Sequence, residues 1–131
     1  MGKRQTTALK DIPLLAECVV SELKGGEIFA LVGPLGSGKT TFVKAVGKAL
    51  KIRHKITSPT FALLNRYSGK LGRKKILVYH LDLYRTKNFR EVLALGLSEF
   101  WGKKHTLTFI EWADKINRRL PSKTRIIKFV N

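Results

Sequence analysis

The residues Gly33-Pro34-Leu35-Gly36-Ser37-Gly38-Lys39-Thr40 fit the phosphate-binding P-loop pattern at every constrained position. Glycines at three of these positions leave room for backbone N–H groups to turn inward around an anion. In this pattern Lys39 reaches the β and γ phosphates, and Thr40 supplies a hydroxyl for Mg²⁺. We therefore predict a nucleoside triphosphate site. Its predicted binding residues are Gly33, Pro34, Leu35, Gly36, Ser37, Gly38, Lys39, Thr40 and Thr41.

The sequence on either side of this loop predicts a strand and a helix. Residues 27–32 are apolar and partly β-branched, which is typical of a buried strand. After the loop, apolar residues recur at helical spacing from Phe42 to Leu50, while Lys44 and Lys48 face away from them. Strand, loop and helix therefore follow in the order that a P-loop requires. An ordinary glycine turn without a ligand is the alternative that this order disfavours.

The remaining elements predict an α/β fold. Helices are expected over residues 12–24, 88–95 and 113–120, and strands over residues 61–67, 75–81, 106–110 and 124–130. Pro59 excludes a helix around residues 58–60. Helices alternating with apolar strands and one hairpin predict a single P-loop NTPase-like domain over residues 1–131. Its sheet is expected to be mixed, mostly parallel and covered by helices on both faces.

Composition limits the protein further. The chain has 131 residues, enough for one core but too few for a nucleotide site and a separate substrate domain. Its one cysteine, Cys18, is expected to pack beside a helical apolar stripe in a reducing compartment. No apolar run approaches membrane-spanning length, and the N-terminus lacks the apolar segment of a signal peptide. We therefore expect a cytoplasmic protein.

The net charge of +17 is concentrated in the second part of the chain. Residues 1–50 hold 7 basic and 4 acidic groups, whereas residues 51–131 hold 19 basic and 5 acidic groups. Such an excess favours polyanions, and RNA is the main candidate. A generally basic solvated surface is an equal alternative, because no RNA-binding signature is present. Four basic residues are predicted at a solvated hairpin tip: Lys70, Arg73, Lys74 and Lys75.

Two carboxylates are placed to complete a nucleotide site. Asp82 and Glu111 each end an apolar strand, and in a parallel sheet both would emerge beside the phosphates. One can hold Mg²⁺ while the other orients the attacking water. A structural role in capping the following turn is the alternative for either residue alone.

Three further side chains leave their roles open. His80 is interpreted as a core residue in preference to a proton carrier. Arg85 is consistent with either a phosphate contact or an ion pair. Trp112 is expected to contact the core or a partner, with stacking on the nucleotide as the less favoured option.

Five segments together carry a resemblance to a known family. They are Gly33 to Thr41, Thr57-Ser58-Pro59-Thr60-Phe61, His80-Leu81-Asp82-Leu83-Tyr84-Arg85, Gly96-Leu97 and Glu111-Trp112. In order and spacing, over about residues 10–130, they resemble the TsaE family of bacterial ATPases that serve tRNA threonylcarbamoyladenosine synthesis. The P-loop is common to many proteins, whereas Ser58-Pro59-Thr60-Phe61, Asp82-Leu83-Tyr84-Arg85 and Glu111-Trp112 together are specific.

The resemblance implies hydrolysis of ATP with Mg²⁺ and work on a complex of TsaB-like and TsaD-like proteins. That complex transfers threonylcarbamoyl to an adenosine beside the anticodon, and ATP turnover is implied to reset it. Thr60 matches a switch-like threonine near the γ phosphate, and Trp112 matches a residue linked to nucleotide or partner contact. The implied catalytic residues are Lys39, Thr60, Asp82 and Glu111, and the implied metal ligands are Thr40, Asp82 and Glu111.

Two other functions remain open at this stage. A small-molecule or nucleotide kinase shares the P-loop and Mg²⁺ site, but little chain is left for an acceptor pocket and a lid. A basic RNA-binding module with a degenerate P-loop would not depend on Lys39. Direct contact with tRNA through the basic surface is a hypothesis that is compatible with the ATPase.

Overall fold

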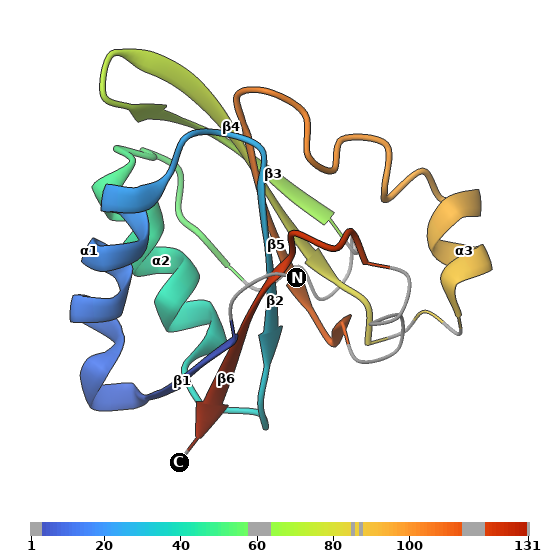
Figure 1. Ribbon diagram of the computed structural model, residues 1–131, viewed down its shortest axis with the longest axis horizontal. Coiled ribbons are helices and arrows are strands. Elements are labelled where there is room, and N and C mark those ends of the chain that lie inside the picture. Colours follow the sequence, from blue (N-terminus) through green and yellow to red (C-terminus); the bar gives the residue numbers. More distant parts are fainter. Residues whose placement is uncertain (1–3, 58–63, 85, 87, 114–119, 131) are drawn as a thin grey trace.

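A computed structural model describes residues 4–57, 64–84, 86, 88–113 and 120–130, which form a sheet between two layers of helices (Figure 1). The strands are β1 (Arg4–Ala8), β2 (Glu27–Val32), β3 (Leu64–Leu71), β4 (Lys74–Asp82), β5 (Thr106–Glu111) and β6 (Arg125–Val130). The helices are a short 3-10 turn η1 (Leu9–Asp11), α1 (Ile12–Glu22), α2 (Lys39–Ala49) and α3 (Phe89–Ala94).

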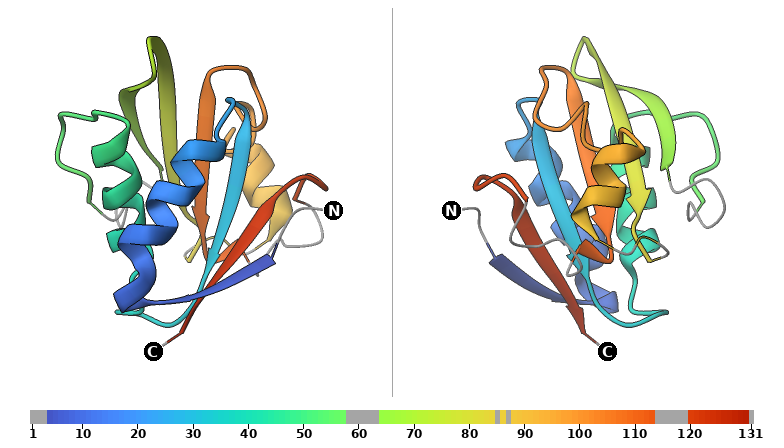
Figure 2. Two further views of the ribbon diagram at one scale, coloured as in Figure 1. Left: turned by 60° about the vertical axis from the view of Figure 1, so that its left-hand side comes forward. Right: turned by 90° about the vertical axis from the view of Figure 1, so that its right-hand side faces the viewer.

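The predicted mixed, mostly parallel sheet is confirmed. The described strands lie in the order β1-β6-β2-β5-β4-β3. Only β3 and β4 pair in an antiparallel direction, as the hairpin that projects beyond the helices in Figure 2. The other neighbours are parallel. Therefore β2, β5 and β4 end at one common edge of the sheet, where an α/β fold of this kind binds ligands.

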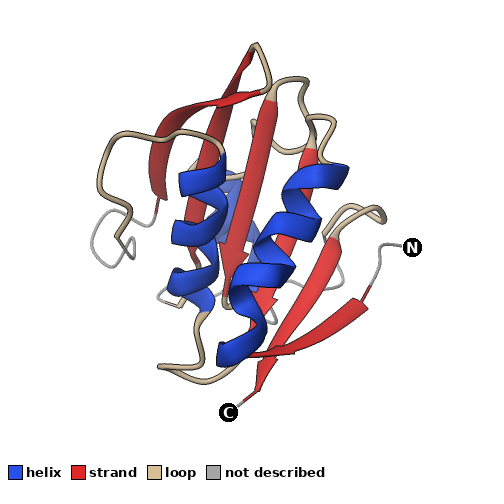
Figure 3. Ribbon diagram, turned by 90° about the vertical axis from the view of Figure 1, so that its left-hand side faces the viewer, coloured by secondary structure: helices blue, strands red, loops and turns tan. Residues whose placement is uncertain are grey.

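Helices α1 and α2 pack side by side on one face of the sheet (Figure 3). In α1, Ile12, Ala16 and Val19 are buried, and the helical spacing of these apolar residues explains the orientation of the helix. Phe42 of α2 lies between two phenylalanines of the sheet, Phe109 and Phe129, with ring centroids 5.8 Å away in each case. This aromatic contact fixes α2, and with it the loop before α2, against the sheet.

Helix α3 covers the opposite face, so the prediction of helices on both faces is also confirmed. Asn88 caps this short helix, because its side-chain oxygen accepts a hydrogen bond from the backbone N–H of Glu91 at 3.1 Å. Val92 of α3 is fully buried on this side. Tyr79 of β4 stacks on Phe100 at 3.8 Å between ring centroids. A second, smaller core therefore supports the sheet from behind.

Parts of the sequence interpretation need correction. Strand β1 was not predicted, because Arg4–Ala8 is a largely polar edge strand without the apolar signal of a core strand. Cys18 is exposed and does not pack into the core, because it lies off the buried stripe of α1. The strand predicted over 61–67 continues to Leu71. Most of the helix predicted over 113–120 lies outside the described residues.

We predict that Phe42→Ala destabilises the protein by about 3–5 kcal/mol, because it leaves a cavity between Phe109 and Phe129. Urea unfolding followed by circular dichroism measures this change. Leu14→Ala is the control, since Leu14 is 71% exposed in the neighbouring helix α1 and should change stability by less than about 0.5 kcal/mol. Equal losses in the two variants would contradict the role assigned to Phe42.

Candidate functional site

The predicted P-loop connects β2 to α2 at the ligand-binding edge of the sheet. Gly36 and Gly38 have φ angles of 75° and 109°, a region that side chains disfavour. A side chain at Gly38 would also overlap Ile12 of α1. The buried Ser37 donates its hydroxyl to the carbonyl of Pro34 at 2.6 Å and closes the turn. The loop is therefore shaped by backbone and packing, and Gly38 occupies the N-cap of α2.

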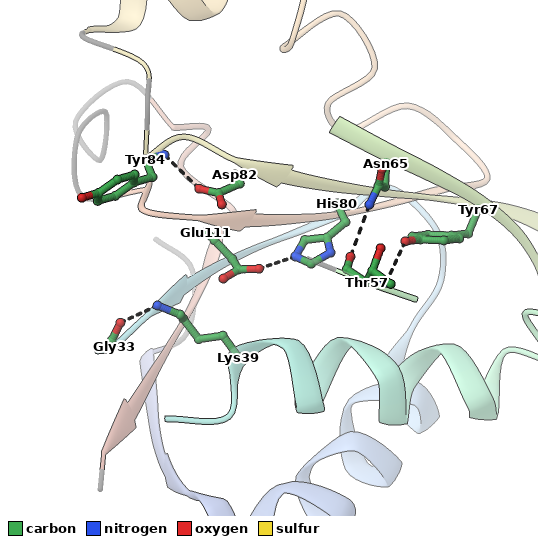
Figure 4. A network of polar contacts seen from close by, with 9 residues as sticks. All are labelled: Gly33, Lys39, Thr57, Asn65, Tyr67, His80, Asp82, Tyr84 and Glu111. Carbon is green, nitrogen blue, oxygen red and sulfur yellow. Dashed lines mark hydrogen bonds and ion pairs between the residues drawn. The ribbon is translucent and has the colours of Figure 1, made fainter. Parts of the chain in front are cut away.

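Lys39 is buried, with only 6% of its surface exposed. Its Nζ donates to the carbonyl of Gly33 at 2.5 Å (Figure 4). The same Nζ lies 4.7 Å from the ring centroid of Trp112. Among the described residues, no carboxylate lies within ion-pair distance of this ammonium group. Burial of a cation is costly unless it is paired. An anion at the loop would supply that partner, so Lys39 fits the predicted phosphate contact.

The two predicted carboxylates are brought together by strand pairing. Asp82 ends β4 and Glu111 ends β5, and the two are direct register partners. Both side chains are almost fully buried. The backbone N–H of Tyr84 donates to Asp82 Oδ1 at 2.9 Å, which fixes the carboxyl in an Asx-type turn. Figure 4 shows the two carboxyl groups and Lys39 converging at this edge.

Burial raises the pKa of the Asp82 carboxyl above its ordinary value, because the charged form loses water. The N–H donated by Tyr84 lowers this pKa in part, and the neighbouring Glu111 raises it further. A divalent cation would favour the charged form of Asp82. Carboxyl and hydroxyl oxygens are also the ligands that Mg²⁺ prefers, so the donor set of this edge fits that ion.

His80 is a site residue whose importance the sequence interpretation underestimated. It is fully buried, as expected for a core residue, but its Nε2 contacts Glu111 Oε2 at 2.5 Å. Its Nδ1 has no hydrogen-bond partner among the residues that the structure describes. The available signal was strand alternation, since His80 and Asp82 are two residues apart and therefore point to the same face of β4. His80 thus holds the Glu111 carboxyl in place.

Trp112 lies beside Lys39 of the P-loop, as well as against the core behind the sheet. Its ring centroid is 4.9 Å from that of Tyr84. Together with Pro34 and Lys39 it lines a cavity of about 270 Å³ next to the loop. Its φ of 59° is left-handed, an unfavourable conformation for a bulky residue that is often found at functional sites. The expected core contact is therefore observed, and the side chain also lies beside the P-loop.

The structure gives less detail on the other predicted site residues. Thr40 and Thr41 lie in the first turn of α2, and Leu35 is 84% exposed at the outside of the loop. Thr60 and Arg85 lie outside the described residues.

Within the described ranges, no group of three or more His, Cys, Asp or Glu side chains is arranged to hold a metal ion. No helix in those ranges is long and apolar enough to cross a membrane.

Comparison with known proteins agrees with this geometry. The family model described as "Threonylcarbamoyl adenosine biosynthesis protein TsaE" matches residues 6–131. The chain belongs to the TsaE family. The resemblance noted from the sequence motifs is thus confirmed over nearly the whole chain.

Individual relatives support the same assignment, and each is named tRNA threonylcarbamoyladenosine biosynthesis protein TsaE. The protein of Aquifex aeolicus is 41% identical over 108 residues, which cover 81% of this chain and 72% of that protein. The protein of Nostoc sp. is 43% identical over 97 residues, which cover 72% of this chain and 57% of that protein. The protein of Bacillus subtilis is 32% identical over 119 residues, covering 91% and 71%.

A solved structure supports the fold. The crystal structure of YdiB from Bacillus subtilis matches with a TM-score of 0.68 and 27% identity, covering 95% of this chain and 74% of that chain. The predicted P-loop NTPase-like α/β fold is thereby confirmed.

We predict that Asp82→Asn stabilises the ligand-free protein at about pH 7 but not at about pH 3. The pKa of Asp82 is raised in the folded state, so its contribution to stability is present at low pH and lost as the pH rises through that pKa. Asparagine removes this titration and can still accept the N–H of Tyr84. Thermal unfolding at both pH values measures the effect.

The matched control is Asp11→Asn, which removes an exposed carboxyl. An equal change in melting temperature at both pH values for Asp82→Asn would contradict the burial of a costly charge at this position.

Proposed function

We propose that this chain is a Mg²⁺-dependent ATPase that acts in the threonylcarbamoyladenosine modification of tRNA. One observation carries the proposal: the buried cation Lys39 and the paired carboxyls of Asp82 and Glu111 converge where the P-loop opens. Membership of the TsaE family supports the pathway. The buried, oppositely charged groups support phosphate chemistry at this site.

The proposed mechanism assigns each group one task. Lys39 exchanges its bond to the Gly33 carbonyl for the β and γ phosphates, and the N-terminus of α2 adds its positive end. Thr40 and Asp82 would hold Mg²⁺, which supplies charge neutralisation on the phosphate oxygens. Glu111 has one carboxyl oxygen occupied by His80, so the other oxygen can accept a hydrogen bond from the attacking water.

His80 is a positioning residue in this scheme. Within the described part of the chain, its buried ring makes its hydrogen bond to the Glu111 carboxyl, through Nε2, and so limits the rotation of that group. Orienting the attacking water is one of the few tasks left to the protein in phosphoryl transfer, because little covalent chemistry is required. A fixed carboxyl therefore favours hydrolysis over simple nucleotide binding.

The proposed partners are TsaB-like and TsaD-like proteins, as the family resemblance implies, in a cytoplasmic setting where tRNA is modified. Turnover of ATP would reset that complex between rounds of transfer. Direct contact with tRNA is a further part of the proposal, supported by the net charge of +17.

We predict that Glu111→Ala retains ATP binding but lowers ATP turnover by about 10²-fold or more, because water loses its acceptor. Titration with a fluorescent ATP analogue and a phosphate-release assay measure the two properties separately. Glu99→Ala, at an exposed carboxyl in the same half of the chain, is the control and should leave both unchanged. Equal loss of binding and turnover would refute the role of Glu111, and a phosphorylated acceptor in place of free phosphate would favour a kinase.

The proposed role is tested by forming threonylcarbamoyladenosine in a reconstituted reaction. The reaction contains TsaB-like and TsaD-like proteins, threonylcarbamoyl-adenylate, tRNA and ATP. Product over many turnovers should require this chain and should be lost with Lys39→Ala, because the phosphates lose their main cation. Lys24→Ala, at an exposed lysine just before β2, is the control and should be fully active. Equal product without the chain would overturn the proposed role.

A further inference from the structure

Positive charge is segregated along the chain in a way that the proposed ATPase does not use. From Ile28 to Leu81, a stretch of 54 residues contains 11 Lys and Arg and no Asp or Glu. Apart from Lys39, every one of these basic side chains is exposed. Such a stretch cannot balance its charge internally, so it presents a continuous positive field to the solvent.

The fold gathers these residues at one edge of the sheet. The exposed ones lie on α2, on the connection of residues 50–57 that follows it, and on the hairpin of β3 and β4 at the edge opposite β1. They are Lys44, Lys48, Lys51, Arg53, Lys55, Arg66, Lys70, Arg73, Lys74 and Lys75. The predicted hairpin tip is confirmed, with the turn at Gly72. The connection passes beside β3, as Figure 3 shows. We call this surface the basic edge.

The basic edge contains a groove of about 580 Å³ between the connection and the hairpin. Three exposed cations line it from separate segments: Lys55 from the connection, Arg66 from β3 and Lys75 from β4. Thr57 and Ser68 add hydroxyl groups, and His54 adds an imidazole. No acidic residue is among the described residues of its lining.

Hydrogen bonds fix the two walls of this groove to each other. The backbone N–H of Lys70 donates to the Leu50 carbonyl at 2.6 Å. Asn65 Nδ2 donates to the Thr57 carbonyl at 3.2 Å, and the Tyr67 hydroxyl accepts the N–H of Thr57 at 3.3 Å. Since Gly69 also packs against the Leu50 carbonyl, a side chain there would be only 2.7 Å from that oxygen. The cations are thus held on a preformed surface, which lowers the ordering cost of binding.

We propose that the basic edge binds the sugar-phosphate backbone of RNA, with tRNA as the ligand. Clustered Lys and Arg gain affinity for polyphosphate by releasing condensed counterions, and hydroxyl groups suit contacts to phosphate and the ribose 2′-OH. Among the described groove residues, the ring of Tyr67 is buried and the His54 imidazole is exposed, so the lining is dominated by cations and hydroxyl groups and not by stacking surfaces. Binding should therefore be salt-dependent and nearly independent of base sequence. The choice of tRNA among RNAs rests on the proposed function.

The groove is connected to the proposed hydrolysis site through the pairing of β3 with β4. Asn65, in its lining, is the register partner of His80, which in turn contacts Glu111. The groove cations Arg66 and Lys75 alternate with Asn65 and His80 along the hairpin, so they project from its opposite face. RNA and nucleotide would therefore occupy separate surfaces of one domain.

The test measures binding of a fluorescently labelled, unmodified tRNA transcript to the full chain by anisotropy, over a range of salt concentrations, without nucleotide or partner proteins. The variant Lys55→Gln/Arg66→Gln/Lys75→Gln removes three groove cations. The control variant Lys24→Gln/Lys123→Gln/Lys128→Gln removes the same charge from exposed positions near the other side of the sheet. Circular dichroism and ATP binding check that both variants are folded.

We expect the groove variant to bind tRNA roughly tenfold or more weakly at low salt, with a salt slope smaller by about three, while the control variant changes little. Equal losses in both variants, or no binding by the parent chain, would overturn the proposal. Displacement of tRNA by poly-glutamate at equal charge concentration would also overturn it, by favouring an acidic protein as the ligand. Because nucleotide is absent, failure here is distinct from failure of the proposed ATPase, which phosphate release measures separately.

Discussion

The site of this protein depends on the parallel alignment of β2, β5 and β4. Because these strands run in the same direction, the P-loop, Glu111 and Asp82 all emerge at one edge of the sheet. Strand alternation then decides which face each side chain reaches, and a slip of one residue would turn a carboxyl away from Lys39. Buried residues such as Phe109, two positions before Glu111, hold that register by packing under α2. The geometry of the candidate site is therefore a by-product of core packing.

The same alignment also buries ionisable groups of the site, Lys39 and Asp82. Lys39 rests on a carbonyl oxygen and an aromatic ring, and the Asp82 carboxyl lies where burial opposes its ionisation. Neither arrangement is favourable for the empty protein. A ligand that carries both a metal cation and an anionic phosphate chain would satisfy the two groups at once. Some folding stability is thus given up so that the site is complementary to such a ligand before it arrives.

Most of the fold, and part of the candidate site, could be predicted from patterns within short stretches of the sequence. The P-loop is a contiguous motif, and strand-end carboxylates follow from the architecture of parallel sheets, so Lys39, Asp82 and Glu111 could be named from the sequence. The contact of His80 with Glu111 could not, because these residues are 31 positions apart and meet only through the β4–β5 register. Strand β1 was missed for a related reason, since its polar residues are ordered by pairing with a distant strand and not by an apolar pattern of their own.

That distant pairing has a consequence for how the chain reaches its final form. β6 lies between β1 and β2 in the sheet. It pairs in parallel with β1, with Arg4 opposite Ile126 and Ala8 opposite Val130, so the two strands meet across nearly the entire sequence. During synthesis on the ribosome, β1 is made first but has nothing to pair with until β6 has left the exit tunnel. The sheet can grow outward from β2, β5 and β4 in the meantime, and insertion of β6 then completes two strand pairings in one step. Closing such a long loop is slow in entropic terms, so this edge should be the last part of the sheet to form.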